Sequence, residues 1–196
     1  MPPLPAVTKA LMLVCTAMFC IMGLVPAVGQ WLALWPLGSG LFMPWQPFTY
    51  GLLHADMWHL FFNMLGLWMF GAELEYLWGP RRYAQFVLAC VLAAATCQAL
   101  MGLLGLGGPT IGISGAVYGM LLASALLFPN RVVMPLFPPI PMKQRTFVMV
   151  FGGLELLQGL GGFGGAAHFA HLGGMAGAWV IMQHWRRRLP WQQPRR

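Results

Sequence analysis

The chain has 196 residues, of which 59% are hydrophobic and only 8% are charged, with a net charge of +7. A soluble domain carries about 25% charged residues, so these side chains are too few to coat a water-soluble protein. The same composition excludes intrinsic disorder, which combines low hydrophobicity with high charge. A mean hydropathy of +0.69 and nine Trp indicate a polytopic membrane protein. At about 20 residues per helical span, the length allows roughly six or seven spans in one domain.

Six apolar segments predict transmembrane helices, so the expected fold is an all-α polytopic bundle. The segments lie at about 9–28, 57–78, 83–104, 114–128, 146–160 and 166–185. Gly79-Pro80 ends the second segment, because glycine and proline stop helices. Residues 29–53 are rich in Trp, Pro and Gly, which is typical of a structured loop at the membrane–water boundary. We expect residues 1–196 to form a single membrane domain.

The basic residues indicate how these spans are oriented. The eleven Lys and Arg lie at 9, 81, 82, 131, 143, 145, 186–188, 195 and 196. With six spans, these positions are the N-terminus, the loops after the second and fourth spans, and the C-terminal segment, which all face one side. The positive-inside rule then predicts that both termini are cytoplasmic and that 186–196 is a basic cytoplasmic tail. The net charge is therefore a topology signal and does not indicate nucleic-acid binding.

Two features of the apolar segments have further interpretations. The first segment also resembles a signal peptide, because one basic residue and an apolar stretch precede the small residues Ala27-Val28-Gly29. Its removal would leave the basic residues on the same side of the membrane. The four cysteines fall in apolar runs without a CxxC pattern, so we interpret them as buried thiols.

Uncharged polar residues inside the spans are the strongest functional signal, because polar groups are costly in lipid. Three groups stand out: His54, His59 and Asn63 at the second span; Gly112, Ser114, Gly115 and Tyr118 at the fourth; and His168 and His171 in the sixth. At about 1.5 Å per residue, Asn63, Ser114 and His171 each lie about 23 Å from the cytoplasmic end of their span. This common depth predicts one shared cavity, several ångströms below the outer surface.

The three groups together offer the parts of a serine hydrolase. A Ser becomes a nucleophile when a His takes its proton. Asn and His side chains and a backbone N–H at a helix start can stabilise the oxyanion that forms. Asp56 lies in the outer loop region, so no Asp is available to orient the His, and the sequence favours a Ser–His dyad over a triad. An aromatic ring such as that of Tyr118 could hold the imidazole by stacking.

Each group also has a structural interpretation. Ser114 between glycines, with Gly115 and Gly119 in a GxxxG pattern, is typical of close helix packing. His59 and Asn63 alone could link helices through hydrogen bonds. The histidines could instead form a proton relay or bind a metal, which leaves a small metal or proton carrier as an alternative class of function.

The combination of motifs resembles the rhomboid intramembrane serine proteases of the bacterial type, with a six-helix core. The resemblance is carried by His54-x4-His59-x3-Asn63, by Gly112-Ile-Ser114-Gly115 with Tyr118, and by Ala170-His171-Leu-Gly173-Gly174. The order and spacing of these motifs match over roughly residues 9–185. The three motifs are specific together, whereas each alone is not.

The resemblance implies a role for each motif residue. Ser114 would be the nucleophile and His171 the general base. His59 and Asn63, together with the Ser114 backbone N–H, would form the oxyanion hole. The supporting residues would be His54 at the outer end of the site, Tyr118 stacked on His171, Gly112 in the nucleophile motif, and Gly115 and Gly174 where two helices approach closely. No cofactor or metal is implied.

The resemblance also implies the substrates and the location of the protein. Substrates would be transmembrane helices of other membrane proteins, which would enter from the lipid bilayer between the second and fifth spans and be cut near their outer end. The protein would be a multi-pass protein of the bacterial inner membrane, with no nucleic acid among its partners. The alternative is a catalytically inactive rhomboid-like protein that binds membrane clients.

A few positions depart from the family pattern or compete within it. Gln46 stands where some family members carry an Arg, so that loop contact is not expected here. His168 competes with His171 as the base, and we favour His171 because Ala precedes it and Gly follows three positions later, as in the family. Glu75 matches an acidic position of the family near the cytoplasmic end, whereas Glu155 in the fifth span receives no role.

Overall fold

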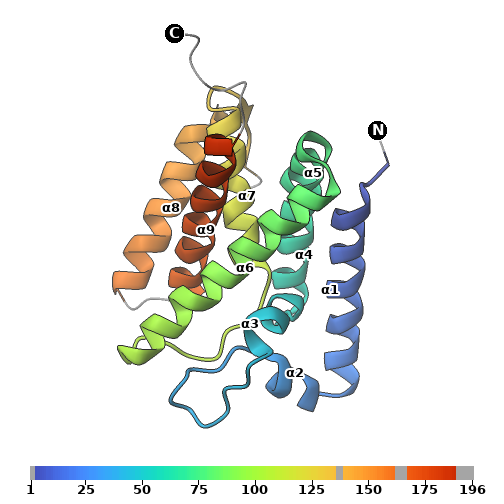
Figure 1. Ribbon diagram of the computed structural model, residues 1–196, viewed down its shortest axis with the longest axis vertical. Helices are drawn as coiled ribbons and strands as arrows, with labels where there is room; N and C mark the ends of the chain where they lie inside the picture. Colours follow the sequence, from blue (N-terminus) through green and yellow to red (C-terminus); the bar gives the residue numbers. More distant parts are fainter. Residues whose placement is uncertain (1–2, 136–138, 162–166, 189–196) are drawn as a thin grey trace.

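The computed structural model of the protein describes residues 3–135, 139–161 and 167–188. It is a bundle of helices in which α6 crosses the others obliquely (Figure 1). The elements in chain order are α1 (Ala6–Leu24), α2 (Ala27–Leu32), α3 (Gln46–Thr49), η1 (Tyr50–Leu52), α4 (Met57–Gly66), η2 (Leu67–Gly71), α5 (Ala72–Trp78), α6 (Pro80–Leu103), α7 (Ser114–Leu127), β1 (Val132–Val133), β2 (Met142–Lys143), α8 (Gln144–Gly161) and α9 (Ala167–Arg188). The two short strands pair antiparallel, with Val132 opposite Lys143.

The first helix is anchored at its N-terminal end by an acid from another helix. Glu75 of α5 accepts hydrogen bonds from the backbone N–H groups of Val7 (2.9 Å) and Thr8 (2.7 Å), and from the Thr8 hydroxyl (2.8 Å). N–H groups in the first turn have no acceptor within their own helix, so Glu75 fastens α1 to α5. At its other end, α1 stops at Leu24, short of the expected residue 28, and α2 begins at Ala27.

The predicted span 57–78 is a continuous run of α4, η2 and α5, with a π-helical turn at η2. Asp56 caps its start by accepting hydrogen bonds from the backbone N–H groups of Trp58 (2.8 Å) and His59 (2.9 Å), as an N-cap Asp does. Gly79 ends it with a φ of 78°, a conformation that favours glycine. Pro80 then begins α6 directly, because proline suits the first turn of a helix.

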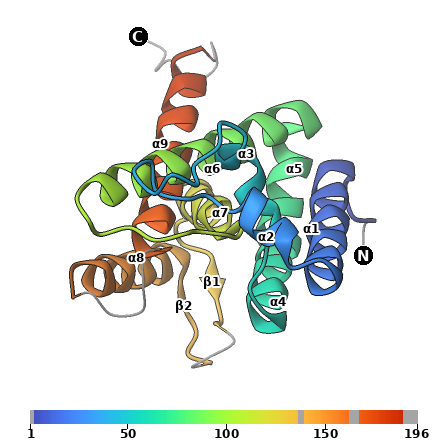
Figure 2. The same cartoon turned by 90° about the horizontal axis from the view of Figure 1, so that it is seen from below.

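Helix α7 lies at the centre of the bundle. Seen end-on in Figure 2, it is surrounded by α4, α6, α8 and α9, and it contacts each of these helices. A glycine within α7 permits close approach of two neighbours: a Cβ at Gly119 would lie 2.6 Å from Sγ of Cys90 on α6 and 3.0 Å from the carbonyl oxygen of Gly174 on α9. The first residue of α7 is Ser114, so this serine sits at the head of the most enclosed helix.

The outer faces of the bundle are apolar. Among the described residues, α1 and α6 are long and apolar enough to cross a membrane, and α7 is a shorter apolar helix. Large exposed apolar side chains include Leu13 and Val14 on α1, Leu88 and Leu100 on α6, Met149 and Leu157 on α8, and Val180 on α9. Exposed apolar surface of this extent is suited to contact with lipid chains.

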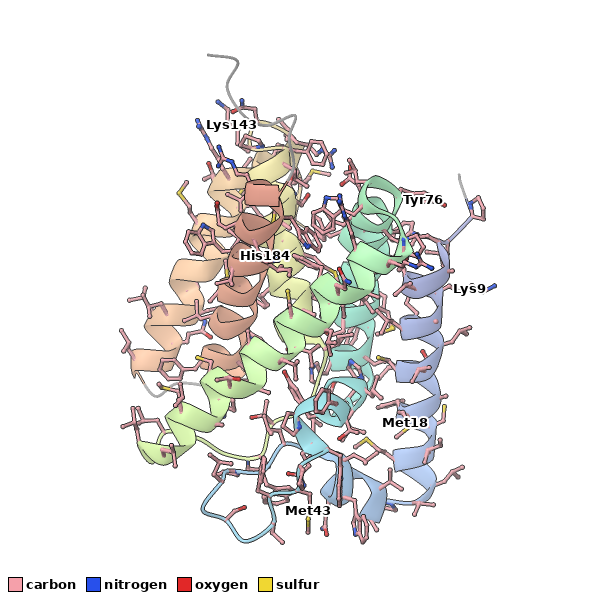
Figure 3. The ribbon with its side chains drawn as sticks, in the orientation of Figure 1. Lys9, Met18, Met43, Tyr76, Lys143 and His184 are labelled. Carbon is pink, nitrogen blue, oxygen red and sulfur yellow. The ribbon has the colours of Figure 1, made fainter. Side chains whose placement is uncertain are left out.

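Charged groups gather at one end of the bundle. The start of α1 and the end of α9 lie at this end, and α2 and α3 lie at the opposite end (Figure 1). Lys143 lies at the first end and Lys9 points sideways from the first part of α1, whereas Met43 lies at the other end (Figure 3). Arg131, beside β1, forms a two-pronged ion pair with Glu73 of α5 at 2.6 and 2.7 Å, which ties the loop after α7 to α5.

Candidate active site

Ser114 and His171 meet where α7 begins. Ser114 is the first residue of α7, and His171 lies in the second turn of α9. The Ser114 Oγ atom is 2.7 Å from Nε2 of His171, which is hydrogen-bond distance. In the tautomer with its proton on Nδ1, the imidazole would accept the serine proton at Nε2. The contact therefore has the geometry of a nucleophile and its general base.

Gly112 shapes the loop that delivers Ser114 to this contact. Its φ of 112° is one that residues with a Cβ rarely adopt, and its N–H donates to the carbonyl of Tyr50 (2.9 Å). A Cβ at Gly112 would lie 2.6 Å from Nε2 of His59 and 3.7 Å from Oγ of Ser114. The glycine therefore leaves room for the His59 ring beside the serine.

The close approach of α7 and α9 sets the distance between serine and histidine. A Cβ at Gly174 of α9 would overlap the carbonyl oxygen of Gly115 on α7, and a Cβ at Gly115 would lie 2.7 Å from the Cβ of Ala94 on α6. Gly115 adjoins Ser114 in the chain, and Gly174 lies about one helical turn after His171. Bulk at Gly174 would push α9 away from α7, and bulk at Gly115 would push α7 away from α6.

The second-span residues line the same site from α4. His59 and Asn63 are one turn apart, and Nδ2 of Asn63 donates to the His59 carbonyl (2.9 Å), which leaves its second N–H for another acceptor. The His54 ring lies edge-on to that of His59, with centroids 5.0 Å apart. Burial, together with the neighbouring His59, lowers the pKa of His54 to about 4, so the His54 ring is neutral at pH 7.

Tyr118 lies between His171 and a buried carboxylate. Its ring stacks on His171, with centroids 4.4 Å apart and an interplanar angle of 10°. Its hydroxyl donates to Oε1 of Glu155 on α8. One side chain therefore restrains the plane of the imidazole and reaches the acid at the same time.

Glu155 and His168 are the site residues that sequence reasoning missed or set aside. Oε2 of Glu155 lies 2.6 Å from Nδ1 of His168 and 2.9 Å from Nδ1 of His171. The first contact is an aligned hydrogen bond, whereas Nδ1 of His171 is close to the oxygen without pointing at it. The signal that could have found Glu155 is its presence as a lone acid in an apolar segment, since ionisable groups inside membranes are rarely incidental.

The same three residues offer the donor atoms of a metal site, and their spacing argues against one. The ligand atoms of Glu155, His168 and His171 lie within 4.8 Å of one another, and two His with a carboxylate is a set that zinc accepts. Ligands at about 2.0–2.1 Å around a tetrahedral metal lie about 3.3 Å apart. Here one oxygen serves two ring nitrogens at 2.6 and 2.9 Å, which is hydrogen-bond spacing.

Gln46 organises the loop between α2 and α3, at the end of the bundle opposite the start of α1. It is 1% exposed, its Oε1 accepts from the backbone N–H of Trp35 (3.2 Å), and its Nε2 donates to the carbonyls of Leu41 (3.0 Å) and Trp31 (3.4 Å). A neutral amide therefore joins the end of α2 to two points of the following loop, at a position where some family members carry an Arg. This role has no signature in the sequence, because it depends on where the loop folds back.

The fold and the site together define a polytopic helical membrane protein with a serine–histidine pair in its interior. A family model described as the Rhomboid domain matches residues 41–187. This match covers most of the chain, and the chain therefore belongs to the rhomboid family, as the motifs indicated. The family includes serine proteases that act within membranes.

The chain is also similar to a curated relative from yeast. This relative is Rhomboid protein 1, mitochondrial, of Saccharomyces cerevisiae, with 31% identity over 91 residues. The matched segment is 45% of this chain and 26% of the yeast protein. The similarity supports the family assignment across a part of the chain.

Proposed function

We propose that this protein is an intramembrane serine endopeptidase that hydrolyses peptide bonds in or near transmembrane segments of other membrane proteins. The observation that carries the proposal is the 2.7 Å contact between Oγ of Ser114 and Nε2 of His171. It joins residues 57 positions apart in the chain, within a fold whose family includes such proteases.

The reaction follows from the two atoms in contact. Oγ of Ser114 attacks the substrate carbonyl carbon while Nε2 of His171 takes the hydroxyl proton. The resulting tetrahedral intermediate expels the amine, which receives that proton from His171, and an acyl ester remains on Ser114. Water, deprotonated by His171, then hydrolyses the ester and restores the serine hydroxyl.

The oxyanion of the intermediate would be held by groups on α4 and at the head of α7. The Ser114 backbone N–H lies in the first turn of α7, where N–H groups have no intrahelical acceptor. The His59 ring adjoins Gly112, two residues before Ser114, and Asn63 has a second amide N–H in addition to the one given to the His59 carbonyl. Removal of a single donor of this kind typically costs about 10²–10³ in rate.

A membrane-embedded helix is the substrate that suits the surroundings of the site. Trp58, Phe61 and Phe62 share α4 with His59 and are 70%, 45% and 51% exposed. Their rings pack against one another with centroids 5.4–6.2 Å apart. This outward aromatic surface on α4 supports approach of an apolar helix from the lipid, between α4 and α8.

The proposal includes a topology. We infer that residues 1–196 form one domain of six membrane spans, with both termini and the basic residues 186–196 in the cytoplasm of a bacterium. The common end reached by the start of α1 and the end of α9 supports this orientation (Figure 1). The outer loop held by Gln46 then faces the opposite side of the plasma membrane.

The test compares Ser114→Ala with a matched serine variant. Purified protein in detergent is mixed with a reporter transmembrane helix, and the cleavage products are quantified. In parallel, the protein is treated with a fluorescent serine-directed phosphonate. Ser114→Ala and His171→Ala should lose cleavage, and Ser114→Ala should lose the label, whereas Ser39→Ala, in the exposed loop after α2, should keep both. Cleavage by Ser114→Ala, or a folded wild type that neither cuts nor labels, would reject the proposal in favour of an inactive client-binding protein.

A further inference from the structure

Glu155 is the acid that the proposed dyad leaves unexplained. The chain has four acidic residues. Asp56 caps α4, Glu73 pairs with Arg131, and Glu75 anchors α1. Glu155 instead lies in the middle of α8, 8% exposed, at a place where a carboxylate is costly unless its oxygens are paired.

The two carboxylate oxygens of Glu155 face the dyad histidine and the tyrosine that stacks on it. Oε1 accepts the hydroxyl of Tyr118, whose ring stacks on His171. Oε2 lies 2.9 Å from Nδ1 of His171. One ring nitrogen of His171, Nε2, therefore contacts Ser114, and the other, Nδ1, lies beside the Glu155 carboxylate. The histidine stands between the nucleophile and the acid.

We propose that Glu155 is a positioning residue for His171, which it holds in the tautomer with the proton on Nδ1 and whose positive charge it balances during the reaction. This inference rests on the proposed function, since it assigns a partner to the base of that dyad. In serine hydrolases, an acid at Nδ1 keeps Nε2 free to take the serine proton and stabilises the imidazolium that results. Here the acid comes from α8, a helix that carries neither dyad residue.

His168 competes with His171 for the same carboxylate oxygen of Glu155. Its Nδ1 is the nearer partner of Oε2, at 2.6 Å against 2.9 Å for His171, and only the His168 contact is aligned. In structures without substrate, catalytic hydrogen bonds are often poorly aligned and tighten only when the reaction complex forms. A small rotation of the Glu155 carboxylate from Nδ1 of His168 toward Nδ1 of His171 would give His171 a hydrogen bond on each side, to Glu155 and to Ser114.

The alternative role for Glu155 is purely structural, as a link between α8 and α9. A structural link would change the melting temperature and the substrate affinity, whereas a positioning role changes the rate of the chemical step. The two roles therefore separate in kcat and KM, measured with the reporter helix. They also separate in the rate of labelling by the small phosphonate, which does not require a substrate helix to bind.

The experiment uses Glu155→Gln, with Glu155→Asp as the conservative variant and Glu73→Gln as the matched control outside the site. We expect Glu155→Gln to lower kcat and the labelling rate about a hundredfold, with KM and melting temperature near wild type. Glu155→Asp should recover part of the loss, and Glu73→Gln should match wild type. A kcat within threefold of wild type for Glu155→Gln, or a loss confined to KM or to melting temperature, would overturn the inference.

Two further arms keep the result decisive. If Glu155→Gln does not fold, Tyr118→Phe replaces it, because this variant keeps the stacked ring and removes only the hydroxyl given to Glu155. A reduced kcat at unchanged KM supports the inference, and an unchanged kcat rejects it. Activity that requires added Zn²⁺ and is lost with a chelator would replace the positioning role by a metal site. Ser114→Ala in the same assay separates the two proposals, since residual cleavage by that variant rejects the protease function itself.

Discussion

Gly174 on α9 lies against the carbonyl oxygen of Gly115 on α7, with no room for a Cβ between them. Each glycine is within about one turn of a dyad residue, so this contact fixes the spacing of Ser114 and His171. We predict that Gly174→Ala lowers the free energy of unfolding by about 1–3 kcal/mol, the usual cost of overpacking a core, and abolishes cleavage. Thermal unfolding in detergent and the reporter assay measure the two effects.

The matched control for that substitution is Gly153→Ala. Gly153 is also helical, and no atom lies within 4 Å of a Cβ built there. Alanine in an open helical position should leave activity intact and stabilise by up to about 1 kcal/mol. Equal losses in both variants would show that helix flexibility, and not the Gly115–Gly174 contact, matters for activity.

His59→Ala is predicted to slow the chemical step. The His59 ring adjoins Gly112, two residues before Ser114, and loss of one oxyanion donor lowers kcat by about 10²–10³. KM should change little, because the interaction strengthens only when charge develops on the substrate oxygen. Steady-state kinetics with the reporter helix check this, with His184→Ala as the control, since His184 lies far along α9 near the charged end (Figure 3). An equal loss of kcat in His184→Ala would reject the assignment of His59 as an oxyanion donor.

Glu75→Gln is predicted to weaken the fold and spare the chemistry. The carboxylate accepts three hydrogen bonds from the first turn of α1. A hydrogen bond to a charged group contributes about 1.5–3 kcal/mol to the free energy of unfolding. We expect the melting temperature to fall while the phosphonate labelling rate below that temperature stays at the wild-type value. Glu73→Gln, which loses a more exposed ion pair, should cost at most about 1 kcal/mol.

Stability should fall in mildly acidic solution because of His54. Its pKa is lowered to about 4 in the folded protein, against about 6.5 in an unfolded chain. The unfolded state therefore binds the extra proton first, and stability is lost as pH falls from about 6.5 to 4, by up to about 3 kcal/mol. Melting curves at pH 7.5 and 5 measure the loss, and His54→Gln should flatten the difference between them.

The sequence was informative about the family and about the residues that meet at the head of α7. The sequence pointed to Ser114, His59 and His171 because polar residues are scarce in apolar segments. The family resemblance is confirmed by the Rhomboid domain match. The sequence did not predict which residues Glu155 contacts. The distance of Glu155 from His171 depends on how α8 is rotated against α9, and no residue spacing within one segment determines that rotation.

Two other features were hidden for different physical reasons. Gln46 bonds to backbone groups of Trp31, Trp35 and Leu41, so its role follows from the path of the loop and not from any pattern of side chains. The π-helical turn at η2 lies within a run of apolar residues, and this run is equally compatible with a regular α-helix. Backbone hydrogen-bond register of this kind is set by packing against neighbouring helices.

The placement of Ser114 as the first residue of α7 has an electrostatic consequence. The aligned peptide dipoles of a helix give its N-terminus about half a positive charge, and α7 contributes 14 residues of such dipoles. Water screens this field at an exposed helix, but α7 has other helices around it (Figure 2), and most of its residues from Gly115 to Ala125 are buried. The negative charge that develops on a substrate oxygen would therefore meet a fixed, weakly screened positive potential before any side chain moves.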